Sequence, residues 1–79
     1  MMKLIIVSPE KTVYSGGAVA VAVPGTKGAF EVLDNHAPII SSLQPGVVTV
    51  KTEDETLEFE IKSGFIEVAC NEVSLCVEQ

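Results

Sequence analysis

The sequence predicts an all-β domain, either a flattened barrel or a two-sheet antiparallel sandwich of about eight to ten short strands. Three observations predict it. Apolar residues recur with a period of two along nearly the whole chain. No stretch of ten or more residues has helical spacing. Prolines at 9, 24, 38 and 45 divide the chain at short intervals. We expect residues 1–79 to form a single domain.

The first half of the chain predicts short strands. Leu4 to Val7 is a run of four apolar residues that Pro9 follows closely. A secretion signal has a longer apolar region, so a first strand is the better interpretation. Between Ala18 and Val23, alanine and valine alternate, which puts branched side chains on one face and methyl groups on the other. We expect the methyl face to allow close approach of another surface.

A first hairpin is predicted in the second half. Residues 56–62 place three large apolar side chains on one face and three charged ones on the other, as in a half-buried antiparallel strand. Its partner is 48–51, where valines alternate with polar residues. The acidic run 53–55 forms the connection between them.

A second hairpin is predicted at the end of the chain. Residues 65–70 lead into an expected turn at Asn71-Glu72. The following strand alternates in burial. We expect Val73, Leu75 and Val77 to face inward and Ser74, Cys76 and Glu78 to face outward.

Composition excludes several functions. Five lysines, no arginine and eleven acidic residues give a net charge of −6, which repels phosphate backbones and anionic lipid. No apolar run approaches the roughly 18 residues of a membrane helix. We therefore expect a soluble chain with no nucleic-acid partner and no direct membrane insertion. Cys70 and Cys76 are too few for a zinc site, and we expect reduced, packed thiols of a cytoplasmic protein.

The sequence offers no catalytic constellation. His36 is the only histidine and has no identifiable orienting partner. Residues 25–28 superficially resemble a phosphate loop, but the required spacing and a following helix are absent. The acidic residues are typical of a turn and of a solvated strand face. We expect no catalytic residue, no cofactor and no metal.

Six short motifs occur in a fixed order along the chain. One such motif would carry little weight, because glycine and proline are common in all-β chains, but six in order are specific. They are Val7 to Glu10, Tyr14 to Gly16, Pro24 to Phe30, Asn35 to Pro38, Gln44 to Gly46 and Ser63 to Phe65. Together they resemble the N-terminal β-sandwich domain of the epsilon subunit of rotary, F-type ATP synthases.

The resemblance implies a non-catalytic rotor subunit of a proton-translocating complex. In the family, this domain clamps the gamma stalk to the polar loops of the membrane c-ring, and so couples ion flow to ATP synthesis. The complex lies on the cytoplasmic face of the bacterial inner membrane, where the subunit is peripheral. Carried over by motif, Gly28, Phe30 and Glu31 would face the c-ring. His36 and Ser41 would face gamma.

Two residues depart from the family pattern. Glu31 stands where many members have glycine after the phenylalanine, and Asp34 where they have proline. A glycine with positive φ cannot be freely replaced by glutamate, so these departures question whether the loop keeps its backbone shape. The alternative is that Glu31 adds a charge to a contact surface.

Family members often continue into a helical hairpin that restrains hydrolysis and in some binds ATP. Because the sequence stops at Gln79, we expect a short form without that hairpin, and no ATP binding. Two other functions stay open. One is a biotinyl- or lipoyl-like carrier, although Lys51 and Lys62 lack the characteristic neighbours of a modified lysine. The other is a small β adaptor of unknown partner.

Overall fold

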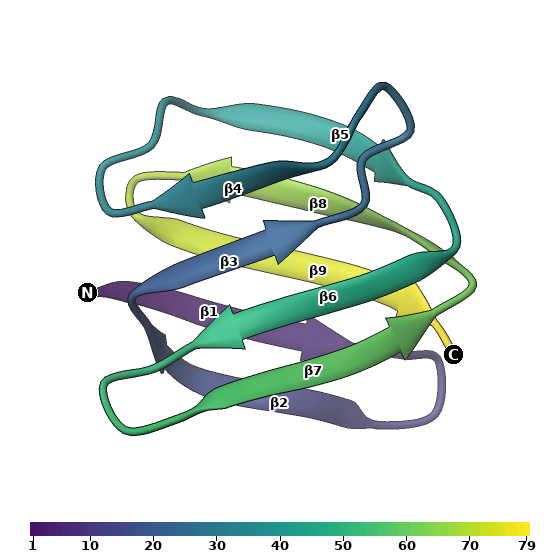
Figure 1. The fold of residues 1–79 in the computed structure, drawn as a ribbon, viewed down its shortest axis with the longest axis horizontal. Coiled ribbons are helices and arrows are strands. Elements are labelled where there is room, and N and C mark those ends of the chain that lie inside the picture. The colour runs from purple at the N-terminus through teal and green to yellow at the C-terminus, as the bar shows by residue number, and fades with distance from the viewer.

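The computed structural model describes residues 1–79 and contains nine strands and no helix (Figure 1). The predicted all-β sandwich of short strands is therefore confirmed. No helix is present that could cross a membrane. The strands are β1 (Met2–Val7), β2 (Thr12–Ala18), β3 (Ala20–Val23), β4 (Phe30–Leu33), β5 (Ile39–Leu43), β6 (Gly46–Lys51), β7 (Thr56–Ile61), β8 (Ser63–Ala69) and β9 (Glu72–Glu78).

Two sheets form the sandwich. One has five strands in the order β2-β1-β9-β8-β5, and the other has four in the order β4-β3-β6-β7. Neighbours are antiparallel, except that the first strand, β1, runs parallel to the last, β9. Because these two strands are parallel, the chain begins at one end of the sandwich and finishes at the other (Figure 1).

The strands alternate in burial because one face of each sheet covers a common core. Sixteen buried apolar residues form a single cluster. In β9, Val73, Leu75 and Val77 belong to this cluster, while the three residues between or after them are exposed. This confirms the predicted orientation of the last strand.

The turn between β8 and β9 lies one residue earlier than predicted. Ala69 pairs with Glu72, so Cys70 and Asn71 form the turn. Their φ angles are 51° and 60°, the left-handed conformation that a two-residue hairpin of this twist requires. The prediction of Asn71-Glu72 was wrong because Glu72 is still paired within the sheet.

The hairpin of β6 and β7 is confirmed. Val48 pairs with Phe59 and Val50 with Leu57. Its connection is closed by Thr52, whose hydroxyl oxygen accepts hydrogen bonds from the backbone N–H groups of residues 54 and 55, at 3.2 and 3.0 Å. The acidic side chains of the connection are exposed.

The Ala18 to Val23 segment is not one strand with a methyl face. The chain passes from the five-stranded to the four-stranded sheet at Val19, which is exposed while Ala18 and Ala20 on either side are buried. This crossing interrupts the alternation. Beyond it, Val21 and Val23 face the core.

Both long sides of the sandwich are closed by contacts between the sheets. On one side, the rings of Tyr14 and Phe59 have centroids 6.4 Å apart, and the Tyr14 hydroxyl donates to the Gly17 carbonyl at 2.8 Å. On the other, the segment after β3 lies along β5, and the Thr26 N–H donates to the Ser42 carbonyl at 3.0 Å. The sequence motifs at Tyr14 and at residues 24–30 thus close the two sides.

The cysteines are free, and both are exposed. The prediction that they are packed was wrong. Cys76 occupies an outward position of β9, and Cys70 lies in the hairpin turn. Neither position faces the core.

We expect Leu75→Ala to lower the free energy of unfolding by about 2–5 kcal/mol, because the side chain is fully buried in the central strand of the larger sheet. Urea unfolding followed by circular dichroism measures the change. Ser74→Ala is the matched control, since Ser74 is exposed on the same strand, and it should stay within about 0.5 kcal/mol of the unsubstituted chain. Equal losses in both variants would contradict the assigned orientation of β9.

Candidate partner-binding surfaces

The outer face of the five-stranded sheet carries several exposed apolar side chains among polar and charged ones. Ile40 is 74% exposed and Phe65 is 64% exposed, the two highest values among the large apolar side chains of the chain. We call the outward group on this sheet the apolar face. It consists of Ile5, Val7, Ile40, Phe65 and Cys76. Contiguous exposed apolar surface marks interaction sites more often than other surface does.

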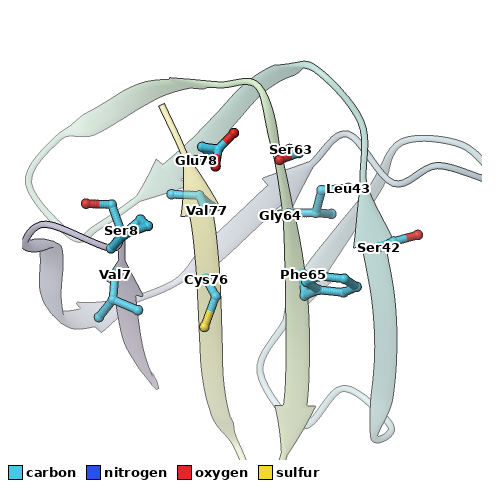
Figure 2. Close-up of a pocket in the computed structure, with 11 residues that line it drawn as sticks. Val7, Ser8, Ser42, Leu43, Ser63, Gly64, Phe65, Cys76, Val77 and Glu78 are labelled. Carbon is cyan, nitrogen blue, oxygen red and sulfur yellow. The ribbon is translucent and has the colours of Figure 1, made fainter.

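The strand register places three of these side chains side by side. Phe65 pairs with Cys76, and Cys76 in turn lies opposite Val7. Figure 2 shows these three residues on neighbouring strands, with Ser42 of β5 beyond Phe65. Residues that sit opposite one another across a sheet share a face, so the row spans four adjacent strands.

Two open hollows adjoin the apolar face. One, of about 560 Å³, extends from Val7 across β9 and β8 to Ser42 (Figure 2). The other, of about 230 Å³, lies beside Ile40. Phe65 and Cys76 line both hollows, so the Phe65 ring stands between two depressions that a partner can fill.

Gly64 allows β8 to approach β9 closely beside Phe65. A Cβ atom at Gly64 would lie 2.6 Å from the Cys76 carbonyl oxygen, a backbone atom that cannot move aside. The Ser-Gly-Phe motif therefore combines a close strand contact with an exposed aromatic ring. This gives the motif a physical role in shaping the apolar face.

The outer face of the four-stranded sheet is acidic. Glu58 and Glu60 of β7 project from it, and Glu31 of β4 pairs with Lys51 at 3.8 Å. Both partners of this ion pair are well exposed, so it contributes less than about 1 kcal/mol. Val47 is an exposed apolar residue of this sheet. The two outer faces thus differ in character.

The predicted ring-side residues lie at and beside the β3–β4 loop. Gly28 has φ of 131°, and its N–H donates to the Gly25 carbonyl at 3.0 Å. Phe30 is half-buried and packs against the core. Glu31 has no positive φ and pairs with Ala22 in a regular strand. The loop therefore requires glycine at position 28, and glutamate at position 31 imposes no backbone strain.

The predicted gamma-side residues are separated from each other. His36 is half-buried in the connection between β4 and β5, where its Nδ1–H donates to the Ala37 carbonyl at 2.7 Å. Ser41 is half-buried in β5, and its hydroxyl donates to the Ser42 carbonyl at 3.0 Å. Gly28 lies in the loop before β4 and His36 in the connection after it, so the two residues lie at opposite ends of the sandwich (Figure 1).

The structure brings together three of the five predicted contact residues. Gly28, Phe30 and Ser41 line one hollow of about 520 Å³ between the β3–β4 loop and β5. Residues from both predicted sides therefore meet along this edge. Glu31 and His36 lie outside the hollow.

Sequence reasoning missed Ile40 and Phe65 as exposed residues. Ile40 follows another isoleucine, so periodicity could not decide which of the two faces outward. For Phe65 a signal existed, because it lies two residues before Glu67 and shares the solvated side of β8 with it. The motif that contains Phe65 was used only as a family signature.

No group of three or more histidine, cysteine, aspartate or glutamate side chains is arranged to hold a metal ion. His36 has a backbone carbonyl as its hydrogen-bond partner and no acidic side chain bonded to it. The residues of these surfaces are suited to contact with other proteins, through apolar side chains on one sheet and polar loops at the ends.

Residues 1–79 match the family model described as ATP synthase, Delta/Epsilon chain, beta-sandwich domain. The chain belongs to this family. The resemblance read from the six motifs is thereby confirmed, and it places the chain among ATP synthase subunits that are not themselves catalytic.

Relatives within the family include ATP synthase epsilon chains of Leptospira and Chlorobium. The ATP synthase epsilon chain of Leptospira borgpetersenii is 35% identical over 77 residues, which cover 98% of this chain and 61% of that one. The epsilon chain of Chlorobium limicola is 38% identical over 77 residues, covering 96% and 88%. The chain thus spans about three fifths of the length of the Leptospira relative and most of the Chlorobium one.

The fold also recurs in a solved assembly. A chain in the structure of the central stalk and c-ring of the Tetrahymena thermophila mitochondrial ATP synthase aligns with a TM-score of 0.86. The alignment covers 99% of this chain and 63% of that chain at 14% identity. This likeness establishes a shared sandwich fold.

We expect Gly28→Ala to lower the melting temperature by about 4–8 °C, the change that roughly 1 kcal/mol produces in a domain of this size. An added Cβ would meet nothing within 4 Å, so the loss would come from the backbone strain of an L-residue at this φ. D-alanine at position 28 of a chemically synthesised chain is the control, because D-residues favour positive φ. Melting followed by circular dichroism should show no comparable loss for the control, and equal losses would contradict the strain argument.

Proposed function

We propose that this chain is a non-catalytic rotor subunit of a proton-translocating F-type ATP synthase, which clamps the gamma stalk to the c-ring. The observation that carries the proposal is the apolar face on a chain whose whole length matches the epsilon family. A carrier domain would present a lysine for modification. Lys51 and Lys62 are exposed here but lack the characteristic neighbours of a modified lysine.

The apolar face is assigned to gamma. Permanent interfaces between subunits bury an apolar centre within a polar rim. Ile40 and Phe65 supply such a centre, and the polar residues Glu67 and Ser74 lie beside it, in the row that begins at Ile40. His36 lies in the connection before β5, and Ser41, opposite the buried Ile66, points away from the apolar face, so both would reach gamma only along the β5 edge of the sheet. The Ser41 hydroxyl already donates a hydrogen bond to the Ser42 carbonyl, so Ser41 would contribute mainly through packing.

The β3–β4 loop is assigned to the polar loops of the c-ring. Lys27 and Gly28 are exposed there, and Phe30 anchors the base of the loop to the core. Glu31 lies next to the loop on the acidic sheet, where it is already paired with Lys51. Its charge is thus partly balanced before any partner binds, and we expect a smaller role for Glu31 than for the loop itself.

A mechanical role is consistent with the packing. Close-packed protein interiors have low compressibility, so a small sandwich can pass load between two partners with little deformation. Here the gamma surface lies on one sheet and the ring surface at one end of the same rigid unit. In the cell, the chain would lie at the cytoplasmic face of a bacterial inner membrane as part of the peripheral complex.

The proposal is tested by co-purification of tagged chain from detergent-solubilised membranes of the source cell, with mass spectrometry of the captured subunits. We expect gamma and c subunits with the unsubstituted chain. Phe65→Ala should lower affinity for gamma about 30-fold or more, the effect of truncating a central aromatic anchor. Val47→Ala is the control, because Val47 is an exposed apolar residue of the other sheet.

The outcomes separate the family function from the assigned face. If Phe65→Ala and Val47→Ala retain gamma equally, the apolar face is the wrong surface although the rotor function stands. If neither gamma nor c is captured by the unsubstituted chain, the rotor function fails. A defined set of other captured proteins would then favour the small adaptor.

The two ends of the sandwich should report different neighbours. We expect a photo-crosslinking amino acid at Ala29, beside Gly28, to form adducts with the c subunit, and the same probe at His36 to form adducts with gamma. Asp54, in the exposed β6–β7 connection, is the control position and should yield neither. Gel mobility and mass spectrometry of the assembled complex identify the adducts. Adducts of c from His36 would reverse the assigned orientation.

A further inference from the structure

Three separate segments meet at the end of the sandwich that contains His36. They are the N-terminus, the β4–β5 connection at residues 34–38 and the β8–β9 turn at residues 70–71. Figure 1 shows the chain beginning at this end. The β4–β5 connection carries the chain from the smaller sheet to the larger one, so its position depends on what holds it to both.

Asn71 bonds to both of the other segments. Its side-chain Oδ1 accepts a hydrogen bond from the backbone N–H of Asn35 at 2.8 Å. Its Nδ2 donates to the Met1 carbonyl at 3.4 Å, and its own backbone carbonyl accepts from the Lys3 N–H at 3.2 Å. No other side-chain hydrogen bond in the structure joins the β8–β9 turn to the β4–β5 connection.

The chemistry of this position favours asparagine. The φ of Asn71 is 60°, and asparagine adopts this conformation more readily than other residues with a side chain, glycine aside. Its amide supplies one acceptor and two donor hydrogens, which the contacts to Asn35 and Met1 both need. An aspartate side chain would supply the acceptor for the Asn35 N–H but no donor for the Met1 carbonyl. Glycine would allow the positive φ but supply neither group.

The Asn35 N–H lies in the turn at the start of the β4–β5 connection. Asn35 is itself in the left-handed conformation, with φ of 63°, and the next N–H, that of His36, donates to the Leu33 carbonyl at 3.2 Å. The turn has two backbone donors, the N–H groups of Asn35 and His36. The Leu33 carbonyl accepts from His36, and the Asn71 side chain accepts from Asn35. This hydrogen bond helps to hold the turn from which His36 leaves, together with the ion pair at 3.0 Å between the Met1 amino group and the Asp34 carboxylate.

We propose that Asn71 is a positioning residue for the partner-binding connection, holding residues 35–38 so that His36 and the start of β5 face gamma. The proposal rests on the proposed function for its partner. Asn71 acts through Asn35 and lies in a turn of its own, outside the apolar face. Removing its side chain should loosen the connection while leaving the core intact.

The test compares three variants. Asn71→Gly keeps a backbone that accepts positive φ and removes the amide. Cys70→Gly is the matched control, because Cys70 has φ of 51° in the same turn but makes no side-chain hydrogen bond in the structure. Asn71→Asp is the rescue variant, since its carboxylate can still accept from the Asn35 N–H.

Amide hydrogen exchange by nuclear magnetic resonance gives the first measurement. We expect exchange at Asn35 to rise about tenfold in Asn71→Gly, with exchange at the core residue Leu75 unchanged. Cys70→Gly should leave Asn35 as in the unsubstituted chain, and Asn71→Asp should restore most of the protection. Unchanged exchange at Asn35 in Asn71→Gly, or an equal rise in Cys70→Gly, would overturn the proposal.

Affinity for purified gamma gives the second measurement, because a purely structural role would not move it. We expect the dissociation constant to rise about fivefold in Asn71→Gly, as for one lost hydrogen bond. In a His36→Ala background the same substitution should add no further loss. A rise in Asn35 exchange with unchanged gamma affinity would overturn the positioning role. Absence of gamma binding by the unsubstituted chain would instead reject the proposed function, which the exchange measurement does not depend on.

Discussion

One apolar core, shared by two sheets, is the constraint on which the rest of this structure depends. A chain of 79 residues buries a smaller fraction of its surface than a larger domain does, so it has room for only one such core. Every strand contributes at least one buried apolar side chain to this core, and β2, which contributes only Ala18, also packs Tyr14 against it. No buried polar residue interrupts the cluster.

Because the core takes one face of each sheet, the other faces are free to differ. The four-stranded sheet turns glutamates outward, as alternation in β7 already indicates. The five-stranded sheet exposes Ile40 and Phe65 beside charged residues such as Glu67. Exposure of this kind weakens solubility without adding to the core, which is why it argues for a partner surface. The same alternation thus produces both the fold and the contrast between its two surfaces.

The glycine-rich motifs have separate structural roles at particular residues. Gly28 provides a backbone conformation that an L-residue adopts with strain, and Gly64 lets two strands approach. Glu31, which departs from the family pattern, lies in regular strand geometry and forms an ion pair with Lys51. A motif read as one unit therefore mixes positions that the backbone requires with positions that are open to change. Only the structure separates the two kinds.

By itself the sequence determined the all-β class, the two hairpins of the second half, the inward residues of β9 and, through six ordered motifs, the family. These features follow from local periodicity and from turn chemistry, which neighbouring residues encode. Tertiary structure decided the crossing at Val19, the parallel pairing of β1 with β9, and the side-by-side placement of Val7, Phe65 and Cys76. It also decided that Asn71 reaches Asn35, 36 residues earlier in the chain. Such contacts join residues far apart in sequence, and no local pattern can specify which strands become neighbours.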